Sequence, residues 1–184
     1  ERLAFLEAHP AETESRDDLS IERITLYNQL GRYEEAKALI AARKFHPWEG
    51  GEGKITGQYT ICHVELAKIA LREHRYADAL ALLQATDQYP YNLGEGKLIN
   101  AEENDIWYYK GLAYRGLGDE ENATLWLHKA TQGSAEPQQA FFYNDAQPDK
   151  IFYQGLAWRA LGEEGKARGR FNKLIKHGEK HLFD

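Results

Sequence analysis

The chain has 184 residues, of which 42% are hydrophobic and 28% charged, a composition typical of a folded globular protein rather than a disordered one. Its net charge of −6 argues against nucleic-acid binding, which needs clustered Lys and Arg. No apolar run approaches the ~20 residues of a membrane-spanning helix, so we expect neither nucleic acid nor a membrane as a partner.

Two further features of the composition bear on where the protein works. Cys62 is the only cysteine, so no internal disulfide can form; this fits a reducing compartment, and we expect a cytoplasmic protein. The chain begins at Glu1 and contains no methionine, so we interpret it as a fragment of a longer protein.

One short phrase recurs four times along the chain, at 30–36, 73–79, 117–123 and 161–167. Each copy ends in an alanine, and the alanines recur with a period of roughly 44 residues: Ala36, Ala79, Ala123 and Ala167. Apolar residues three and four positions apart lie on both sides of the phrase. The pattern predicts a helix, a tight turn and a second helix in every repeat.

The glycine and the alanine of the phrase have separate predicted roles. Gly31, Gly118 and Gly162 lack a Cβ and can adopt the left-handed conformation that commonly ends a helix. The alanine is small because the two helices approach closely there, and a larger side chain would force them apart. We therefore expect the four alanines to occupy equivalent environments.

The predicted elements, in chain order, are a half-unit and four helix pairs. Leu3 to Ala8, stopped by Pro10, is the expected second helix of a preceding unit, and pairs follow at about 18–44, 57–87, 104–131 and 148–176. The third pair carries Trp107, Lys110-Gly111, Tyr114, Gly118, Ala123, Leu127 and Ala130, and the fourth Ile151, Gln154-Gly155, Trp158, Gly162, Ala167, Phe171 and Leu174. This order resembles the tetratricopeptide (TPR) signature. The resemblance implies an all-α fold, a TPR-like α-solenoid of about four antiparallel helix pairs plus a half-unit, in one array over 1–184.

Three long segments separate the pairs, at about 44–56, 87–104 and 131–148, because the period exceeds the ~34 residues of a TPR repeat. We expect them to emerge on one edge of the array, and loops this long are more often functional than neutral. The first two contain near-copies of one phrase, His46-Pro47-Trp48-Glu49-Gly50-Gly51-Glu52-Gly53-Lys54 and Tyr89-Pro90-Tyr91-Asn92-Leu93-Gly94-Glu95-Gly96-Lys97.

The Gly-Glu-Gly-Lys ending of this phrase is not a phosphate-binding loop. The Walker pattern requires glycine where Trp48 and Tyr91 stand, and Ser or Thr where Ile55 and Leu98 stand. Two interpretations stay open: glycine turns with the Pro and the aromatic ring packed over helix ends, or an edge that contacts a ligand or a neighbouring domain. The candidate binding residues of the second interpretation are Trp48, Glu52, Lys54, Tyr91, Glu95 and Lys97.

The region around the third loop differs from the first two. We expect Phe141-Phe142-Tyr143 to be part of the core, the alternative being an exposed anchor for a partner. Asp105 and Asp149 stand where helices should begin, and we expect their carboxylates to cap those helices.

A second set of candidates follows from the TPR resemblance, since the first helix of each TPR pair lines a concave surface. The residues that the alignment places on that face are Tyr108, Arg115, Phe152 and Arg159. The two arginines are one repeat apart, so we expect them to stack, with an aromatic ring above each, and to hold a carboxylate or a peptide. The alternative is that both lie over apolar surface with solvated head groups.

No pattern in the sequence predicts catalysis. His177 and His181 would share a helix face, but the zincin pattern is not met and no neighbouring ligand completes a zinc site. Cys62 and His63 are adjacent and should point to different faces of a helix, which argues against a cysteine nucleophile. We expect a non-enzymatic protein without a metal or cofactor.

The chain also resembles the C-terminal repeat region of large bacterial proteins whose N-terminal part is similar to galactose-mutarotase-like β-sandwiches. The phrases that carry this resemblance are 46–54, Tyr143-Asn144-Asp145 and Ile151-Phe152-Tyr153-Gln154-Gly155. Stacked helix pairs favour a protein–protein or interdomain scaffold, whose partner is another protein or an attached domain of the same chain. The β-sandwich resemblance implies the alternative, an accessory or ligand-binding module of a carbohydrate-active bacterial protein, with carbohydrate as the ligand.

Overall fold

The computed structural model describes residues 1–138 and 147–182, which form ten α-helices and one short 3₁₀ helix and contain no strand. In chain order these are α1 (Arg2–Ala8), α2 (Pro10–Ser15), α3 (Asp17–Gln29), α4 (Tyr33–Ala41), α5 (Lys54–Arg72), α6 (Tyr76–Ala85), η1 (Tyr91–Leu93), α7 (Asn104–Gly116), α8 (Glu120–Ala130), α9 (Asp149–Ala160) and α10 (Glu164–Lys180). The predicted all-α class is confirmed. The segment Phe141-Phe142-Tyr143 and the neighbouring Asn144 and Asp145 lie outside the described residues.

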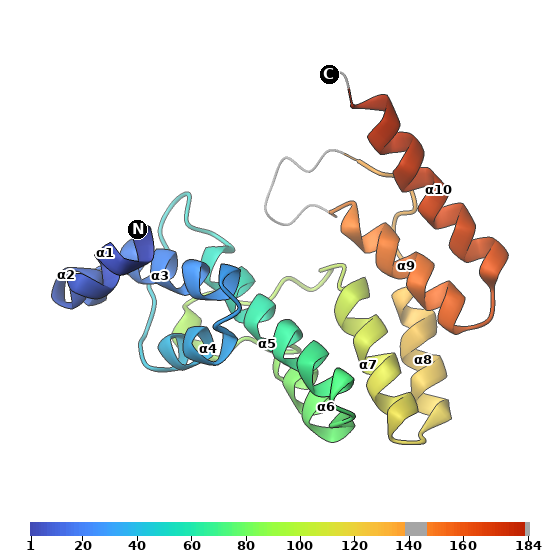
Figure 1. The fold of residues 1–184 in the computed structure, drawn as a ribbon, viewed down its shortest axis with the longest axis horizontal. Helices are drawn as coiled ribbons and strands as arrows, with labels where there is room; N and C mark the ends of the chain where they lie inside the picture. Colours follow the sequence, from blue (N-terminus) through green and yellow to red (C-terminus); the bar gives the residue numbers. More distant parts are fainter. Residues whose placement is uncertain (139–146, 183–184) are drawn as a thin grey trace.

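Antiparallel helix pairs stack along the chain (Figure 1). Helix α3 packs on α4, α5 on α6, α7 on α8, and α9 on α10. Both helices of a pair also contact the first helix of the next pair: α3 and α4 contact α5, α5 and α6 contact α7, and α7 and α8 contact α9. A fold in which each unit packs on the next is an α-solenoid, which confirms the predicted TPR-like architecture.

A residue in left-handed conformation makes the turn within each pair. Gly31, Gly118 and Gly162 have φ of 75°, 78° and 82°, as predicted. In the second repeat His74 takes this place with φ 59°, and it is the only non-glycine residue with positive φ in the described ranges. Since a side chain in this conformation costs roughly 1–2 kcal/mol, the second turn is strained where the other three are not.

The four phrase-closing alanines are equivalently buried. Ala36, Ala79, Ala123 and Ala167 are each 0% exposed, as predicted from their spacing. In the third pair the facing residue is Gly111, where a Cβ would lie 2.7 Å from Cγ of Leu127 and 3.3 Å from the carbonyl oxygen of Ala123. The two helices therefore approach more closely here than two larger side chains would allow.

The helix predicted at Leu3 to Ala8 is confirmed as α1, but the proline that follows it has a further role. Pro10 does not simply stop a helix, because it is the first residue of α2 after α1 has ended at Ala8. Proline suits this first helical position, where its missing N–H is not needed. Both short helices pack on α3. Among the described residues, no helix combines the length and the apolar character required to cross a bilayer.

Candidate functional site

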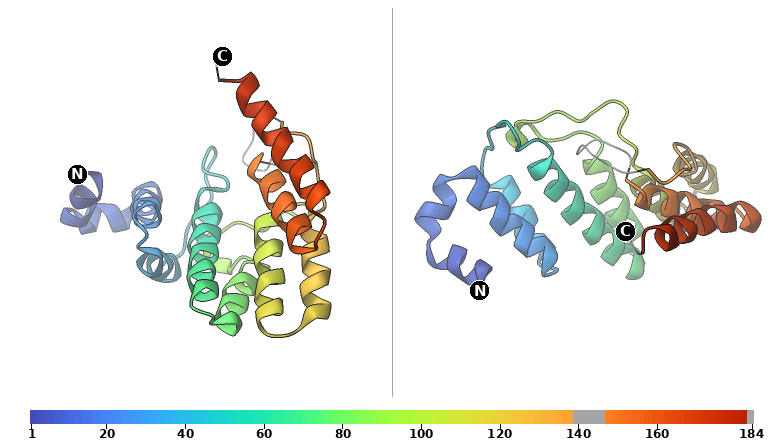
Figure 2. Two further views of the ribbon diagram at one scale, coloured as in Figure 1. Left: turned by 45° about the vertical axis from the view of Figure 1, so that its right-hand side comes forward. Right: turned by 90° about the horizontal axis from the view of Figure 1, so that it is seen from above.

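The described parts of the long inter-repeat loops lie along one edge of the stack (Figure 2, right). The first two, at 42–53 and 86–103, are joined by a hydrogen bond of 2.7 Å from the backbone N–H of Phe45 to the carbonyl of Asn92. The second loop meets the third where the N–H of Ser134 donates to the carboxylate of Glu102 at 3.3 Å. These contacts agree with the common edge expected from the sequence.

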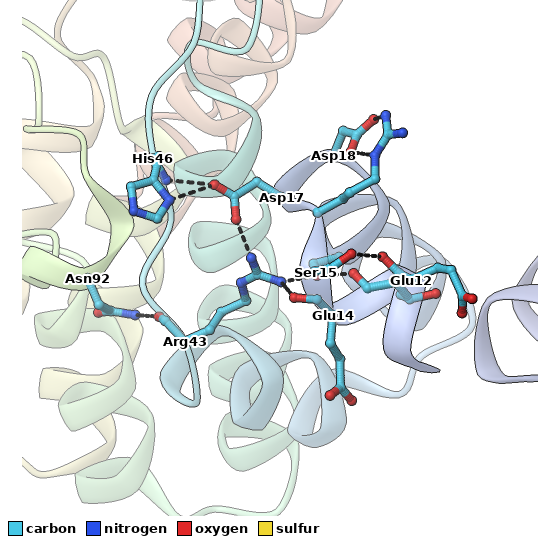
Figure 3. Close-up of polar contacts among 11 residues, drawn as sticks. Glu12, Glu14, Ser15, Asp17, Asp18, Arg43, His46 and Asn92 are labelled. Atoms are coloured by element: carbon cyan, nitrogen blue, oxygen red, sulfur yellow. Dashed lines mark hydrogen bonds and ion pairs between the residues drawn. The ribbon is translucent and has the colours of Figure 1, made fainter. Parts of the chain in front are cut away.

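Asp17, the first residue of α3, fastens the first loop to the array. Its carboxylate accepts hydrogen bonds from the guanidinium of Arg43 and from the backbone and ring nitrogens of His46, the latter two at 2.8 and 3.1 Å. Figure 3 shows the carboxylate between these two residues. Arg43 also donates to the carbonyl of Glu14 at 2.9 Å, and Asn92 donates to the carbonyl of Arg43 at 2.9 Å. The loop is thus held on both sides before it turns outward.

Beyond this anchor the loop places Trp48 as one wall of a hollow of about 240 Å³. Gly51 lies against the indole, and a Cβ at Gly51 would be 2.2 Å from Cε2 of Trp48. Only glycine permits this packing, so the glycine-rich phrase has a specific task here. The other lining residues come from α3 and α5: Asp18, Ile21, Glu22, Thr25, Lys54 and Gln58. We call this feature the Trp48 hollow.

The polar groups of the Trp48 hollow differ in whether they have an ion-pair or hydrogen-bond partner within the protein. Asp18 and Glu22 each pair with an arginine. Asn28 donates to the side-chain oxygen of Gln58 at 2.9 Å, which orients that amide and leaves its NH₂ group without an acceptor in the described structure. Lys54 has no carboxylate within ion-pair distance among the described residues, and its ammonium lies 5.6 Å from the centre of the Trp48 ring. In the described part of the chain, the groups of this hollow without any partner of opposite charge or acceptor are therefore two donors, the ammonium of Lys54 and the NH₂ of Gln58.

The second copy of the loop phrase folds differently from the first. The ammonium of Lys97 donates to the carbonyl of Thr86 at 2.7 Å and pairs with Glu103 at 2.6 Å, whereas Lys54 begins helix α5. The difference arises because residues 98–103 separate Lys97 from α7, and nothing corresponds to them after Lys54. Lys97 is consequently bound within its own loop.

The remaining loop candidates are also separated by the fold. Glu95 accepts a hydrogen bond of 2.8 Å from the N–H of Gly53, the residue that precedes α5, so its carboxylate links the two loops. Glu52 is exposed. Tyr91 is 88% exposed, although it aligns with the half-buried Trp48. Of the six residues expected to line one edge, only Trp48 and Lys54 line the same hollow.

The groove arginines are engaged within the array. Arg115 donates to the carbonyl of Ala160, in the last turn of α9, at 3.1 Å. Arg159 pairs with Glu164 through two contacts of 3.1 and 3.2 Å. Its guanidinium lies 4.9 Å from the ring centre of Phe171 on α10. Both side chains therefore already use part of the donor capacity on which the predicted carboxylate ladder depends.

The groove aromatics form a cluster rather than lids over the arginines. Tyr108 contacts Tyr109 and Tyr153, with ring centres 5.3 and 6.1 Å apart, and burial raises the pKa of the Tyr108 hydroxyl. Phe152 is 44% exposed and packs edgewise on Tyr153, with ring centres 5.6 Å apart. Phe152 thus keeps an accessible face, and peptide binding at these four residues stays a prediction.

A buried ion pair at Lys110 has no counterpart among the sequence-predicted sites. Its side chain is enclosed, both carboxylate oxygens of Asp87 accept from it at 2.6 and 2.7 Å, and its ammonium lies 4.4 Å from the ring centre of Trp126. Burial lowers the pKa of Lys110, and Asp87 opposes that effect. The sequence contains one indication of this pair, because Lys110 occupies the position at which the TPR signature has leucine.

The expected capping roles of Asp105 and Asp149 are wrong. Neither α7 nor α9 has a side-chain cap, because both aspartates lie inside the first turn of their helix. Asp105 instead accepts from Lys150 at 2.7 Å. Burial by itself lowers the pKa of Lys150, but the nearby carboxylates, Asp105 foremost and then Asp149 and Glu103, together raise it. Among the helices of the described residues, α8 does have a side-chain cap: Asp119 accepts from the N–H of Asn122 at 3.1 Å.

Cys62 and His63 lie closer together than their adjacency suggested. The thiol sulfur is 3.5 Å from Nδ1 of His63, so the expectation of different helix faces is corrected. Cys62 is nonetheless fully buried, and burial raises the pKa of its thiol to about 12, so it stays protonated at neutral pH. Within 1–138 and 147–182, no three His, Cys, Asp or Glu residues gather as metal ligands.

No family model matches this chain. Among solved structures, "MamA RS-1 ArsTM double mutant" is similar with a TM-score of 0.44 and 15% identity, covering 99% of this chain and 86% of that one. "MamA 41-end from Desulfovibrio magneticus RS-1" has a TM-score of 0.44 and 14% identity, with 97% and 85% covered. "Crystal structure of MamA" has a TM-score of 0.39 and 18% identity, with 98% and 86% covered. Similarity at this level gives no functional conclusion for this chain.

Proposed function

We propose that this chain is a protein-binding scaffold that receives an extended segment of a partner, either another protein or an attached domain of the same chain, in the Trp48 hollow. Solenoids of helix pairs offer long surfaces for such contacts, and tryptophan is among the residues that most often dominate binding energy. The observation that carries the proposal is the position of the Trp48 indole, which packs against Gly51 and lines a hollow between two repeats.

The size of the hollow favours a single side chain of a peptide over a compact ligand. Its volume of about 240 Å³ lies below the ~300–1,000 Å³ typical of small-molecule sites. Ile21 and the Trp48 ring provide apolar walls, so an aliphatic or aromatic side chain is the expected anchor.

The charges around the hollow define the rest of the partner segment. Lys54 and the amide NH₂ of Gln58 are donors without acceptors in the described structure, whereas Asp18 and Glu22 already have arginine partners. A carboxylate beside the apolar anchor would satisfy Lys54, and a backbone carbonyl would satisfy Gln58. We therefore propose a segment in which an acidic residue lies next to an apolar one.

Selection from a peptide library tests this proposal directly. A library of random linear peptides is selected on the wild-type protein and counter-selected on Trp48→Ala, and affinities are then measured by calorimetry. We expect the enriched peptides to pair acidic with apolar residues and to lose about thirtyfold in affinity with Trp48→Ala, the typical effect of removing a binding hot spot.

Tyr91→Ala is the matched control, because Tyr91 occupies the aligned position of the second loop but does not line the hollow. Its affinities should equal those of the wild type. Peptides that bind Trp48→Ala as well as the wild type, with helical content unchanged by circular dichroism, would remove the Trp48 hollow from the binding surface.

A further inference from the structure

A second hollow of about 490 Å³ lies where loop 86–103 meets the first turn of α7 and the end of α8. Its lining includes Asp87, Lys97, Glu103, Trp107 and Lys129. In the described part of the chain it shares no lining residue with the Trp48 hollow. Its volume falls within the range of roughly 300–1,000 Å³ typical of small-molecule sites. We call it the loop-2 hollow.

The walls of the loop-2 hollow are held in place before any ligand arrives. Lys97 joins the start of the loop to its end, donating to the carbonyl of Thr86 at 2.7 Å and pairing with Glu103 at 2.6 Å. Leu93 is fully buried, and Asn92 donates to the carbonyl of Ile40 in α4 and to that of Arg43 in the preceding loop. Because these contacts already order the loop, a ligand need not provide the free energy of ordering it.

The cations around this hollow are not all matched by carboxylates. Asp87 pairs with Lys110 behind it, and Glu103 pairs with Lys97. Lys129 has no carboxylate within ion-pair distance among the described residues, and its ammonium lies 4.6 Å from the ring centre of Trp107. Lys129 is therefore an uncompensated positive charge at the rim of this hollow, although the protein as a whole has a net charge of −6. This charge favours an anionic group in the ligand.

The carboxylates of the hollow favour hydroxyl groups on the same ligand, in addition to its anionic group. Asp87 and Glu103 have more lone pairs than their lysine partners use, so both can accept hydrogen bonds from a ligand's hydroxyl groups. A purely apolar body would leave these charged walls desolvated without compensation. We propose that the loop-2 hollow binds a small polyhydroxylated carboxylate, the class of the sugar acids, with its carboxylate on Lys129 and its hydroxyls on Asp87 and Glu103.

Calorimetric titration of the intact protein with four probes tests this inference. D-Glucuronate and D-gluconate carry both features, D-glucose carries hydroxyls without a carboxylate, and acetate carries a carboxylate without hydroxyls. We expect saturable binding of at least one sugar acid, and affinities at least about tenfold lower for glucose and acetate, because each lacks one set of charge-assisted hydrogen bonds.

Lys129→Gln should weaken sugar-acid binding about tenfold, since it removes the uncompensated cation and leaves the neighbouring ion pairs intact. Lys176→Gln on α10 is the matched control and should bind like the wild type, because Lys176 is exposed and has no carboxylate within ion-pair distance in the described ranges. Failure of both sugar acids to bind, equal binding of acetate, or unchanged binding by Lys129→Gln would overturn the proposal. Trp48→Ala should bind these probes normally, so this outcome is independent of the peptide experiment.

Discussion

Replacing Asp87 by alanine leaves the enclosed ammonium of Lys110 without its carboxylate. Lys110 is 0% exposed, and both oxygens of Asp87 lie within 2.7 Å of its nitrogen. Removing one partner of a buried ion pair costs ~3–5 kcal/mol. The side chain of Asp87 is 49% exposed, so water can enter its place, and we expect the lower free-energy cost of ~2–3 kcal/mol.

Lys110→Met, in contrast, should change the stability of the protein little. Methionine has a similar volume and restores an apolar residue at the position where the TPR signature has leucine. Asp87, being half exposed, can hydrate once the lysine is gone. Because a buried ion pair and a well-packed apolar residue are often of similar stability, we expect Lys110→Met to lie within ~1 kcal/mol of the wild type. The double variant should recover most of the loss caused by Asp87→Ala.

The pH dependence provides an independent check of the same reasoning. Burial lowers the pKa of Lys110 in the folded state, so above that pKa the unfolded chain binds more protons and the stability rises with pH until the unfolded lysine titrates near ~10.4. Asp87→Ala removes the group that opposes the shift, so this rise should begin at lower pH. The stability gap between Asp87→Ala and the wild type should therefore narrow from pH 7 to pH 9, whereas Lys110→Met lacks this contribution.

Urea unfolding followed by far-UV circular dichroism at pH 7, 8 and 9 measures all four proteins, and the double-mutant cycle gives the coupling energy. A double variant as unstable as Asp87→Ala would show that the loss does not come from the unpaired lysine. An Asp87→Ala protein within ~0.5 kcal/mol of the wild type would likewise show that the pair behaves as an exposed one, because exposed ion pairs contribute only about that much.

Two more stability predictions use residues that the chain itself provides as comparators. His74→Gly should stabilise the protein by ~0.5–1 kcal/mol in urea unfolding, because glycine relieves the positive φ and the other turns already use it; a loss of stability would contradict this. Asp17→Ala should cost ~2 kcal/mol, through lost hydrogen bonds to Arg43 and His46, but Asp18→Ala less than ~0.5 kcal/mol, through an exposed ion pair. Both aspartates lie in the first turn of α3, so their helix-dipole contributions cancel in the comparison, and equal losses would contradict the anchoring role.

The repeat architecture was predictable because its signals are local. The turn at Gly118 and the contact at Ala123 depend on residues a few positions apart, and their recurrence in each repeat reinforces the pattern. Where the signal was a single residue, as at Asp105, the prediction of a cap was wrong. A shift of one or two positions in the start of a helix changes which carboxylate can reach the free N–H groups.

The helix pairs, the positions of their turns and the small residues between them could be predicted from the sequence, since all of these follow from helical periodicity and backbone sterics. Which charged side chains are available to a ligand depends on contacts that form only when the chain folds. Lys54 and Lys97 end similar phrases, yet in the described part of the chain Lys54 has no carboxylate partner beside Trp48, whereas Lys97 is bound between Thr86 and Glu103. The partners of Lys97, Thr86 and Glu103, lie outside the phrase on either side of it, so the phrase alone cannot specify whether its charge is already neutralised by the fold or is left to bind a ligand.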